Sequence, residues 1–527
     1  MIYRSTFTCS WLALCLALSY PAASQTPTAG QLFQDGKFKE AQARYSKQLS
    51  DQPHDVDSAI GLLRTDLRLD QWHAAEDMGA SLVKEFPTNG DIAGLYSMAL
   101  MRGGRPNEAS RWAVAALHLD PRSYWALIAS SRINVWQSHL QTAVEQAEQA
   151  VAINPTGAAA QYYLLDAQSA RDVVPASMPA NAVRYFALKP VGHPHAFVMR
   201  ALPGRMPILK FEVNHPPFQV LGNTAEQAVG HRTAVLTFPF TMVGGSIVLQ
   251  CKIDNVPARL LFDTGGGSDI TLNSSVARRL KLKPMARSVV YGVSGYEPVD
   301  IYMAQRLSVG TTVLGPVAVE SVKQSVPGEF DGILGGAAFL TYSVTIDFKS
   351  HVIRLVPGAS APPPRPLPGD QLITVPFNIL EGDVVVRATV MGHAGYFILD
   401  TGDDEDGTLA AWLGTAIAGT MKPSQYKVIN LNARVGLGTT ATAQQIRLFN
   451  KPLSLQLQSL GGATHEERLV PSLAANLVDT QISPADDFEM AGLIGIGVIR
   501  RFRRITMDYV HGLLTLEIPI AKEGGHP

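Results

Sequence analysis

Apolar residues between 29 and 170 recur at helical spacing and show no strand-like alternation. The pattern repeats every 34 residues, and three kinds of marker keep that period. They are small alanines, helix-ending prolines and turn residues: Ala41, Ala75, Ala109 and Ala143; Pro53, Pro87, Pro121 and Pro155; Gly36, Asp70, Gly104 and Ser138. Alanine permits close helix packing, and proline ends the second helix of each unit. The spacing therefore predicts an all-α solenoid of stacked helix pairs.

The pattern changes twice after residue 170. From 171 to 234 the chain is rich in proline and weakly periodic, which predicts a packed connector with room for short strands. Beyond it, short β-branched runs broken by Gly, Asn and Pro indicate an all-β remainder. A proline-rich stretch at 358–369 predicts a stiff, extended linker. This linker divides the β region into two lobes, 235–357 and 370–519.

The two lobes carry the same sequence plan. Residues 247–263 match residues 384–400 at a constant separation of 137, and both stretches run into an Asp-Thr-Gly triplet. Further along, Gly332–Gly335 matches Gly492–Gly495 at a separation of 160. Each lobe therefore has a strand that leads into a triplet and, later, a short apolar-apolar-Gly strand.

The two triplets are Asp263-Thr264-Gly265 and Asp400-Thr401-Gly402. With these motifs, residues 235–519 resemble the pepsin and retropepsin superfamily, especially its bacterial retropepsin-like members. The repeats at 29–170 resemble the tetratricopeptide repeat family. The first resemblance implies an aspartic endopeptidase, a hydrolase in which each lobe contributes one catalytic aspartate, Asp263 or Asp400. It also implies that the hydroxyls of Thr264 and Thr401 brace the opposite loop.

Paired carboxylates suit peptide hydrolysis for a physical reason. Two carboxylates at hydrogen-bonding distance repel each other strongly when both are ionised, so the pair holds one proton. The ionised member takes a proton from water, and the protonated member donates to the peptide carbonyl oxygen. Gly265 and Gly402 let the two loops approach face to face, where a Cβ would obstruct them. This reaction needs no metal ion and no organic cofactor, so we expect neither.

A hairpin flap that closes over substrate is a further implication of the resemblance. The candidate in the first lobe is Tyr291-Gly292-Val293-Ser294-Gly295, whose glycines suit a mobile hairpin tip. An ordinary Gly-containing hairpin fits this segment nearly as well. The segment Arg434–Thr439 occupies the equivalent place in the second lobe.

The residues after the second triplet depart from the family pattern. Where the family has a small residue, the second lobe has an acidic run: Asp403, Asp404, Glu405 and Asp406. Negative charge so close to Asp400 is expected to raise the proton affinity of the carboxylate pair. An EF-hand calcium loop does not fit this run, because the position of its glycine would make Gly402 the first ligand.

The composition and the N-terminal sequence indicate which partners and which cellular compartment to expect. The chain has 527 residues and a formal net charge of −1, which argues against nucleic acid and acidic membrane surfaces as partners. Residues 1–24 have the features of a secretory signal peptide, and their apolar stretch is too short to span a membrane. We therefore expect an exported protein, periplasmic or secreted, without a stable membrane anchor. The mature chain would keep only Cys251, so no internal disulfide forms.

Three functional hypotheses remain open. The first is a single-chain endopeptidase, a pseudo-dimeric monomer that cleaves polypeptides with Asp263 and Asp400. The second is an inactive two-lobed module that binds peptides or acts as a scaffold. The third assembles the site between two chains, each supplying Asp263. The sequence has no H-E-x-x-H or G-x-S-x-G motif to support another hydrolase class. The repeats offer a surface for a protein partner, but no residue pattern names their ligand.

Overall fold

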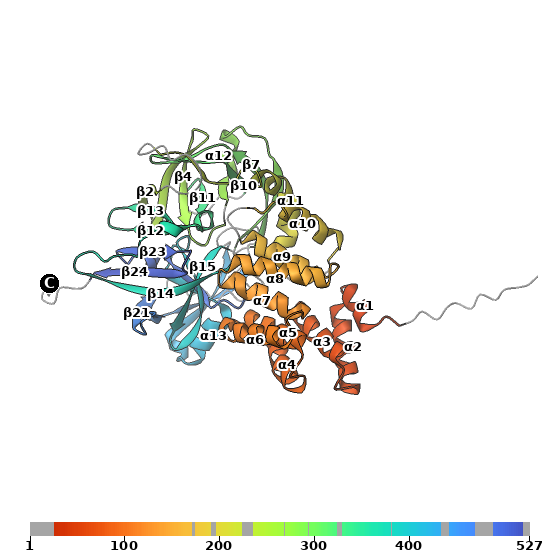
Figure 1. The fold of residues 1–527 in the computed structure, drawn as a ribbon. Coiled ribbons are helices and arrows are strands. Elements are labelled where there is room, and N and C mark those ends of the chain that lie inside the picture. Colours follow the sequence, from red (N-terminus) through yellow and green to blue (C-terminus); the bar gives the residue numbers. More distant parts are fainter. Residues whose placement is uncertain are drawn as a thin grey trace, which may run out of the picture.

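The computed structural model describes residues 26–170, 174–190, 196–223, 235–267, 269–292, 295–323, 329–380, 382–433, 442–469 and 488–519. Helices dominate the first part of the chain and strands the rest (Figure 1). The predicted fold class, an all-α repeat solenoid followed by an all-β bilobal region, is confirmed. The candidate signal peptide lies outside the described residues. Among those residues, no helix has both the length and the apolar character needed to cross a membrane.

Five helix pairs form the solenoid. They are α1 (Ala29–Gln34) with α2 (Phe38–Asp51), α3 (Val56–Arg68) with α4 (Trp72–Glu85), α5 (Gly90–Arg102) with α6 (Pro106–Leu119), α7 (Tyr124–Trp136) with α8 (Leu140–Ile153), and α9 (Ala158–Ser169) with α10 (Met178–Ala187). The four marker alanines are fully buried. The turn residues have the left-handed backbone that ends a first helix, as at Asp70, where φ is 57°, and Gly104, where φ is 70°.

Most of the described part of the connector is helical, which its weak periodicity did not predict. Helix α10 completes the last pair of the solenoid, and α11 (Ala196–Glu212) follows it. Among the described residues of the connector, β1 (Gln219–Asn223) is the only strand, and it pairs with β9 (Thr312–Gly315) of the first lobe. The proline content concealed these helices, because both of them contain proline. Pro179 stands in the first turn of α10, where proline is tolerated, whereas Pro203 and Pro207 lie inside α11, where proline is normally disfavoured.

The described part of the first lobe consists mainly of strands, with the short helix α12 between β5 and β6 in the sequence. Its remaining elements are β2 (Leu236–Val243), β3 (Ser246–Ile253), β4 (Val256–Asp263), β5 (Ile270–Asn273), α12 (Ser274–Arg279), β6 (Ala286–Gly292), β7 (Gly295–Ala304), β8 (Leu307–Val309), β10 (Val317–Val322), β11 (Gly332–Gly335), β12 (Tyr342–Asp347) and β13 (Val352–Pro357). Alternate side chains of β2 are buried, as period-two patterning requires for a strand with one face on the core.

The second lobe repeats this plan. Its elements are β14 (Asp370–Leu380), β15 (Asp383–Val390), β16 (His393–Asp400), β17 (Gly407–Leu409), α13 (Ala411–Gly419), β18 (Tyr426–Ala433), β19 (Thr442–Phe449), β20 (Leu453–Gln458), β21 (Thr464–Leu469), β22 (Gly492–Gly495), α14 (Ile496–Ile499), β23 (Arg504–Asp508) and β24 (Leu513–Pro519). One continuous core joins the two lobes, because buried side chains of both belong to a single apolar cluster.

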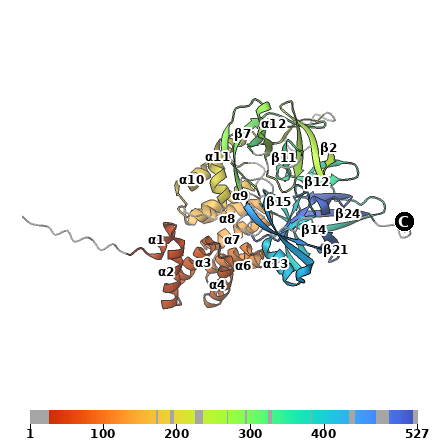
Figure 2. The same cartoon turned by 180° about the vertical axis from the view of Figure 1, so that it is seen from behind.

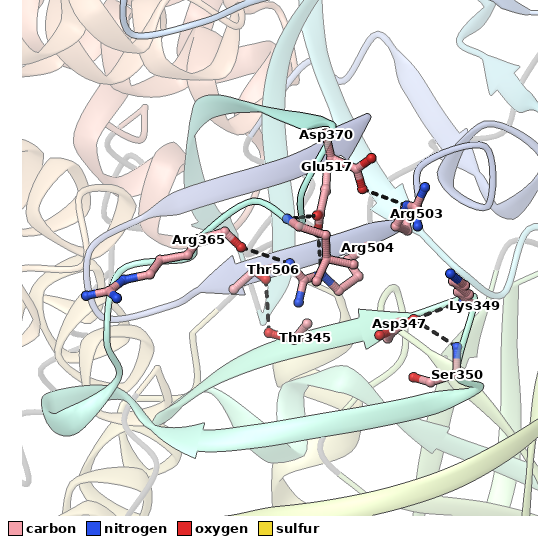
Figure 3. A network of polar contacts seen from close by, with 11 residues as sticks. Thr345, Asp347, Lys349, Ser350, Arg365, Asp370, Arg503, Arg504, Thr506 and Glu517 are labelled. Carbon is pink, nitrogen blue, oxygen red and sulfur yellow. Dashed lines mark hydrogen bonds and ion pairs between the residues drawn. The ribbon is translucent and has the colours of Figure 1, made fainter. Parts of the chain in front are cut away.

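A six-stranded antiparallel sheet runs beneath both lobes, in the order β2, β13, β12, β23, β24, β14. At its centre the equivalent residues Thr345 and Thr506 face each other, and their hydroxyls lie 2.9 Å apart (Figure 3). The linker is fastened to this sheet, because Leu367 N donates to the buried Glu517 carboxylate and Arg504 donates to Arg365 O. Backbone pairing therefore fixes one lobe against the other.

The solenoid packs along one side of the two lobes (Figures 1 and 2). Trp136, at the end of α7, stacks on Phe488 with ring centroids 4.7 Å apart and meets the edge of Tyr396 at 5.4 Å. Asn378 Nδ2 donates to the carbonyl of Trp136 at 3.0 Å. These contacts belong to an apolar cluster that the solenoid shares with the second lobe. The repeats are thus docked on the β region, and not simply tethered to it.

Candidate active site

Each Asp-Thr-Gly triplet begins where a strand passes beside a glycine-ended strand. In the first lobe β11 runs parallel to β4, and Gly335 lies opposite Asp263. In the second lobe β22 runs parallel to β16, and Gly495 lies opposite Asp400. A Cβ on Gly335 would stand 1.8 Å from the carbonyl oxygen of Gly267, so only glycine fits there. The two sequence separations, 137 and 160, therefore describe one local structure built twice.

Two threonines lock the triplets together. Thr264 N donates to Thr401 Oγ1, and Thr401 N donates to Thr264 Oγ1, each over 3.0 Å. The Thr264 hydroxyl in turn donates to Leu399 O at 2.6 Å, and the Thr401 hydroxyl donates to Phe262 O at 2.7 Å. Both threonines are fully buried. Each hydroxyl therefore donates once and accepts once, which is the cross-bracing that the family resemblance implies.

This bracing brings the two aspartates into direct contact. The carboxyl groups of Asp263 and Asp400 hydrogen-bond each other, and both residues are only partly exposed. Gly265 N donates to Asp263 Oδ1 at 2.9 Å, and Gly402 N donates to Asp400 Oδ1 at 2.7 Å. A Cβ on Gly402 would lie 2.5 Å from the Asp263 carboxyl carbon, and one on Gly265 would lie 2.9 Å from that of Asp400. Glycine at both positions is thus a steric condition for the contact.

The pKa values of both aspartates are raised, so the pair holds a shared proton. Burial, followed by the charge of Asp263, holds the pKa of Asp400 well above its usual range. Burial also raises the pKa of Asp263, but the hydrogen bonds that it accepts from Asp400 and Gly265 oppose that rise. The pair titrates as a unit. One carboxylate and one carboxylic acid therefore stand side by side.

The charge of Asp403 raises the pKa of Asp263, as expected of an acidic residue beside the pair. The Asp403 carboxylate turns back into its own loop, where it accepts from Glu405 N and from the hydroxyl of Thr408, each at 3.2 Å. Burial, and then the charge of Asp400, raises the pKa of Asp403 to about 7. Its backbone N–H donates to Asp400 Oδ1 at 3.2 Å. Asp403 is therefore neutral at acidic pH and adds charge beside the pair only near and above pH 7.

Asp403→Asn is expected to move only the alkaline limb of the pH–activity profile. The amide stays neutral above pH 7, so Asp400 loses its shared proton more easily and the limb shifts to lower pH. The acid limb stays in place, because wild-type Asp403 is already protonated there. A raised folded-state pKa also weakens the folded state as pH rises toward 7, so the variant should unfold at a higher temperature near neutral pH. A shift of the acid limb would contradict this assignment.

The flap candidate lies on a hairpin. Strands β6 and β7 pair antiparallel, with Tyr291 opposite Tyr296 and Gly292 opposite Gly295. Val293 and Ser294 lie outside the described residues. The second-lobe candidate, Arg434–Thr439, is also outside them, but β18 and β19 on either side of it pair along their whole length. Both lobes therefore have a hairpin at the corresponding place.

Sequence reasoning missed one pair of residues near the site. Asp269 and Asp406 lie six positions after Asp263 and Asp400, so they share the separation of 137 that aligns the triplets. Each forms an ion pair with an arginine: Asp269 with Arg205, and Asp406 with Arg501. The matched spacing could have identified the aspartates, but nothing in the sequence pattern pointed to their partners. Within the described part of the chain, no cluster of three His, Cys, Asp or Glu side chains is placed to hold a metal ion.

Known proteins resemble separate parts of this chain. A family model described as aspartyl protease matches residues 249–338, the stretch that holds the first triplet and β11. Soybean basic 7S globulin is 12% identical, covering 56% of this chain and 97% of its own, with a TM-score of 0.34. A thermophilic TPR protein of Thermus thermophilus is 19% identical, covering 30% of this chain and 84% of its own, with a TM-score of 0.26. A search of curated proteins returns no match. The chain thus contains an aspartyl protease-like domain.

Proposed function

We propose that this chain is an aspartic endopeptidase whose two lobes supply Asp263 and Asp400 to one active site. The observation that carries the proposal is the mutual bracing of Thr264 and Thr401, which holds the two carboxyl groups in hydrogen-bonding contact. An inactive peptide-binding module has no need to keep two buried carboxyls together, because their mutual repulsion and desolvation destabilise the fold. Keeping the two carboxyls in contact is useful when they transfer the shared proton during a reaction.

In the proposed reaction, Asp263 is the ionised member of the pair and Asp400 holds the shared proton. Ionised Asp263 takes a proton from a water molecule as the water oxygen attacks the scissile carbonyl carbon. At the same time Asp400 donates its proton to the carbonyl oxygen, which gives a neutral tetrahedral intermediate. When the carbon–nitrogen bond breaks, the proton held by Asp263 passes to the leaving amine, and Asp400 recovers a proton from the intermediate. Both aspartates return to their starting states.

The one-chain site is the form that the geometry supports best. The second lobe already occupies the place that a partner chain would take, through the threonine bracing and the six-stranded sheet. Polypeptide is the substrate class, since the repeats and the protease-like domain both suit extended chains. We also propose export, periplasmic or secreted, on the strength of residues 1–24. The repeats remain a candidate surface for a protein partner.

The test is cleavage of a peptide library by purified residues 25–527. We expect cleavage that is competed by a pepstatin-like mimic of the tetrahedral intermediate, because such mimics bind more tightly than substrates. A chelator should leave turnover unchanged, since the proposed chemistry uses only carboxylates. Loss of cleavage on chelation, or no cleavage of any peptide over a wide pH range, would remove the support for this function.

A further inference from the structure

The loop that carries Asp263 is anchored by an arginine from outside the two lobes. In the second lobe, Asp406 pairs with Arg501, which follows α14 within the same lobe. The corresponding residues of the first lobe, Leu340 and Thr341, are uncharged. Asp269, the equivalent of Asp406, instead forms its ion pair with Arg205 of helix α11. Among the described residues, Asp269 thus has its arginine partner on the connector and not within the first lobe.

Arg205 makes two ion pairs in a secluded setting. Its guanidinium contacts Asp269 and also lies 2.5 Å from Glu320 Oε1 on β10. The side chains of Asp269 and Glu320 are only 11% and 7% exposed, so water competes weakly with these contacts. Glu212, from the next turns of α11, is also buried nearby, and burial raises the pKa of Glu212 and of Glu320 to about 7. Carboxyls crowded around one guanidinium depend on its charge, and its removal would leave them uncompensated.

Helix α11 is held tightly in the position that this contact requires. Ser288 Oγ of β6 donates to Ala201 O at 2.7 Å, and a Cβ on Gly204 would stand 2.0 Å from Arg287 O. One face of the helix packs on the first lobe through Ile208. The other face packs into the solenoid core through Leu202 and Leu209. The helix thus contacts the first-lobe hairpin, the Asp263 loop and the repeats at once.

We propose that Arg205 is a positioning residue that orders the Asp263 loop, so the first half of the active site is completed by the connector helix. This inference rests on the proposed endopeptidase function for its consequence in catalysis. Arg205 does not touch the reacting atoms. It acts through Asp269, at the far end of the loop that begins with the triplet. The working protease unit therefore extends back to α11, well before the stretch that the family model matches.

The experiment compares residues 25–527 with three variants, Arg205→Ala, Arg205→Lys and Arg105→Ala. Arg105 is a matched control, since it also pairs with two carboxylates, Glu76 and Glu108, but lies in the solenoid. For Arg205→Ala we expect kcat on the best library peptide to fall by about 10- to 100-fold with little change in KM, because a loop displaced by about 1 Å misaligns the attack. Arg205→Lys should restore part of kcat, and Arg105→Ala should match wild type.

A second readout does not depend on catalysis. Backbone amide exchange of residues 264–267, measured by mass spectrometry, should be faster in Arg205→Ala than in wild type and Arg105→Ala. If the wild-type protein has no activity, the proposed endopeptidase function is wrong. The amide exchange would still test whether Arg205 orders the loop. Should Arg205→Ala not fold, Asp269→Asn replaces it, with the same direction expected. Unchanged kcat together with unchanged exchange in the folded variant overturns the inference.

Discussion

Asp263→Asn is expected to abolish peptide cleavage, with kcat/KM falling by at least about 10³-fold while the fold is retained. The amide has the same volume, and its oxygen can still accept the hydrogen bond from Gly265 N. It cannot take a proton from water, so the attacking nucleophile is not activated. The measurement is turnover of a library-derived peptide, with an active-site titration to confirm that substrate and inhibitor sites are intact.

The unfolding temperature shows whether Asp263→Asn has lost only its chemistry or also its structure. The pKa of Asp263 is raised in the folded protein, so this carboxyl weakens the folded state progressively as pH rises through that pKa. Removing it should leave the unfolding temperature unchanged at acid pH and raise it at neutral pH. Asp347→Asn is the matched control, because Asp347 caps a turn of the six-stranded sheet by accepting from Lys349 N and Ser350 N. Wild-type turnover in Asp263→Asn would place the chemistry elsewhere.

Periodic features were predicted well because their physical cause is local. The 34-residue step depends on helix packing and turn geometry within each unit, and the structure shows buried Ala41 and left-handed Asp70 at the expected places. The separations of 137 and 160 likewise reflect strand, loop and glycine positions inside each lobe. Because the two lobes repeat each other, their sequences could be checked against one another without the structure.

Features that depend on contacts between distant segments could not be predicted. The stacking of Trp136 on Phe488 joins residues that carry no shared pattern. The ion pair between Arg205 and Asp269 links a proline-containing helix to a loop of the first lobe. The protonation of Asp403 depends on how its side chain turns within a loop, and the acidic run alone suggested a charge near Asp400. In each case the sequence showed that the residue was present, but not which groups surround it in the folded protein.

Asp400→Asn is expected to be as damaging as Asp263→Asn, with a loss of at least about 10³-fold in kcat/KM. In the proposed mechanism Asp400 holds the shared proton, and burial and the charge of Asp263 raise its pKa. An asparagine can donate an N–H to the carbonyl oxygen but cannot transfer a proton to it, so the intermediate stays charged. The hydrogen bonds from Gly402 N and Asp403 N can still be accepted by the amide oxygen, so the loop should keep its conformation.

The same variant decides between a one-chain and a two-chain site. If two copies of the first lobe formed the site, Asp400→Asn would cost little, and specific activity would rise with protein concentration as pairs formed. In a one-chain site, specific activity stays constant when the protein concentration is varied over about a thousandfold range. We expect the constant value, because Leu399 and Thr401 already occupy both bonds of the Thr264 hydroxyl from within the chain. A second first lobe could bind there only after the second lobe had released those bonds and the pairing of β12 with β23.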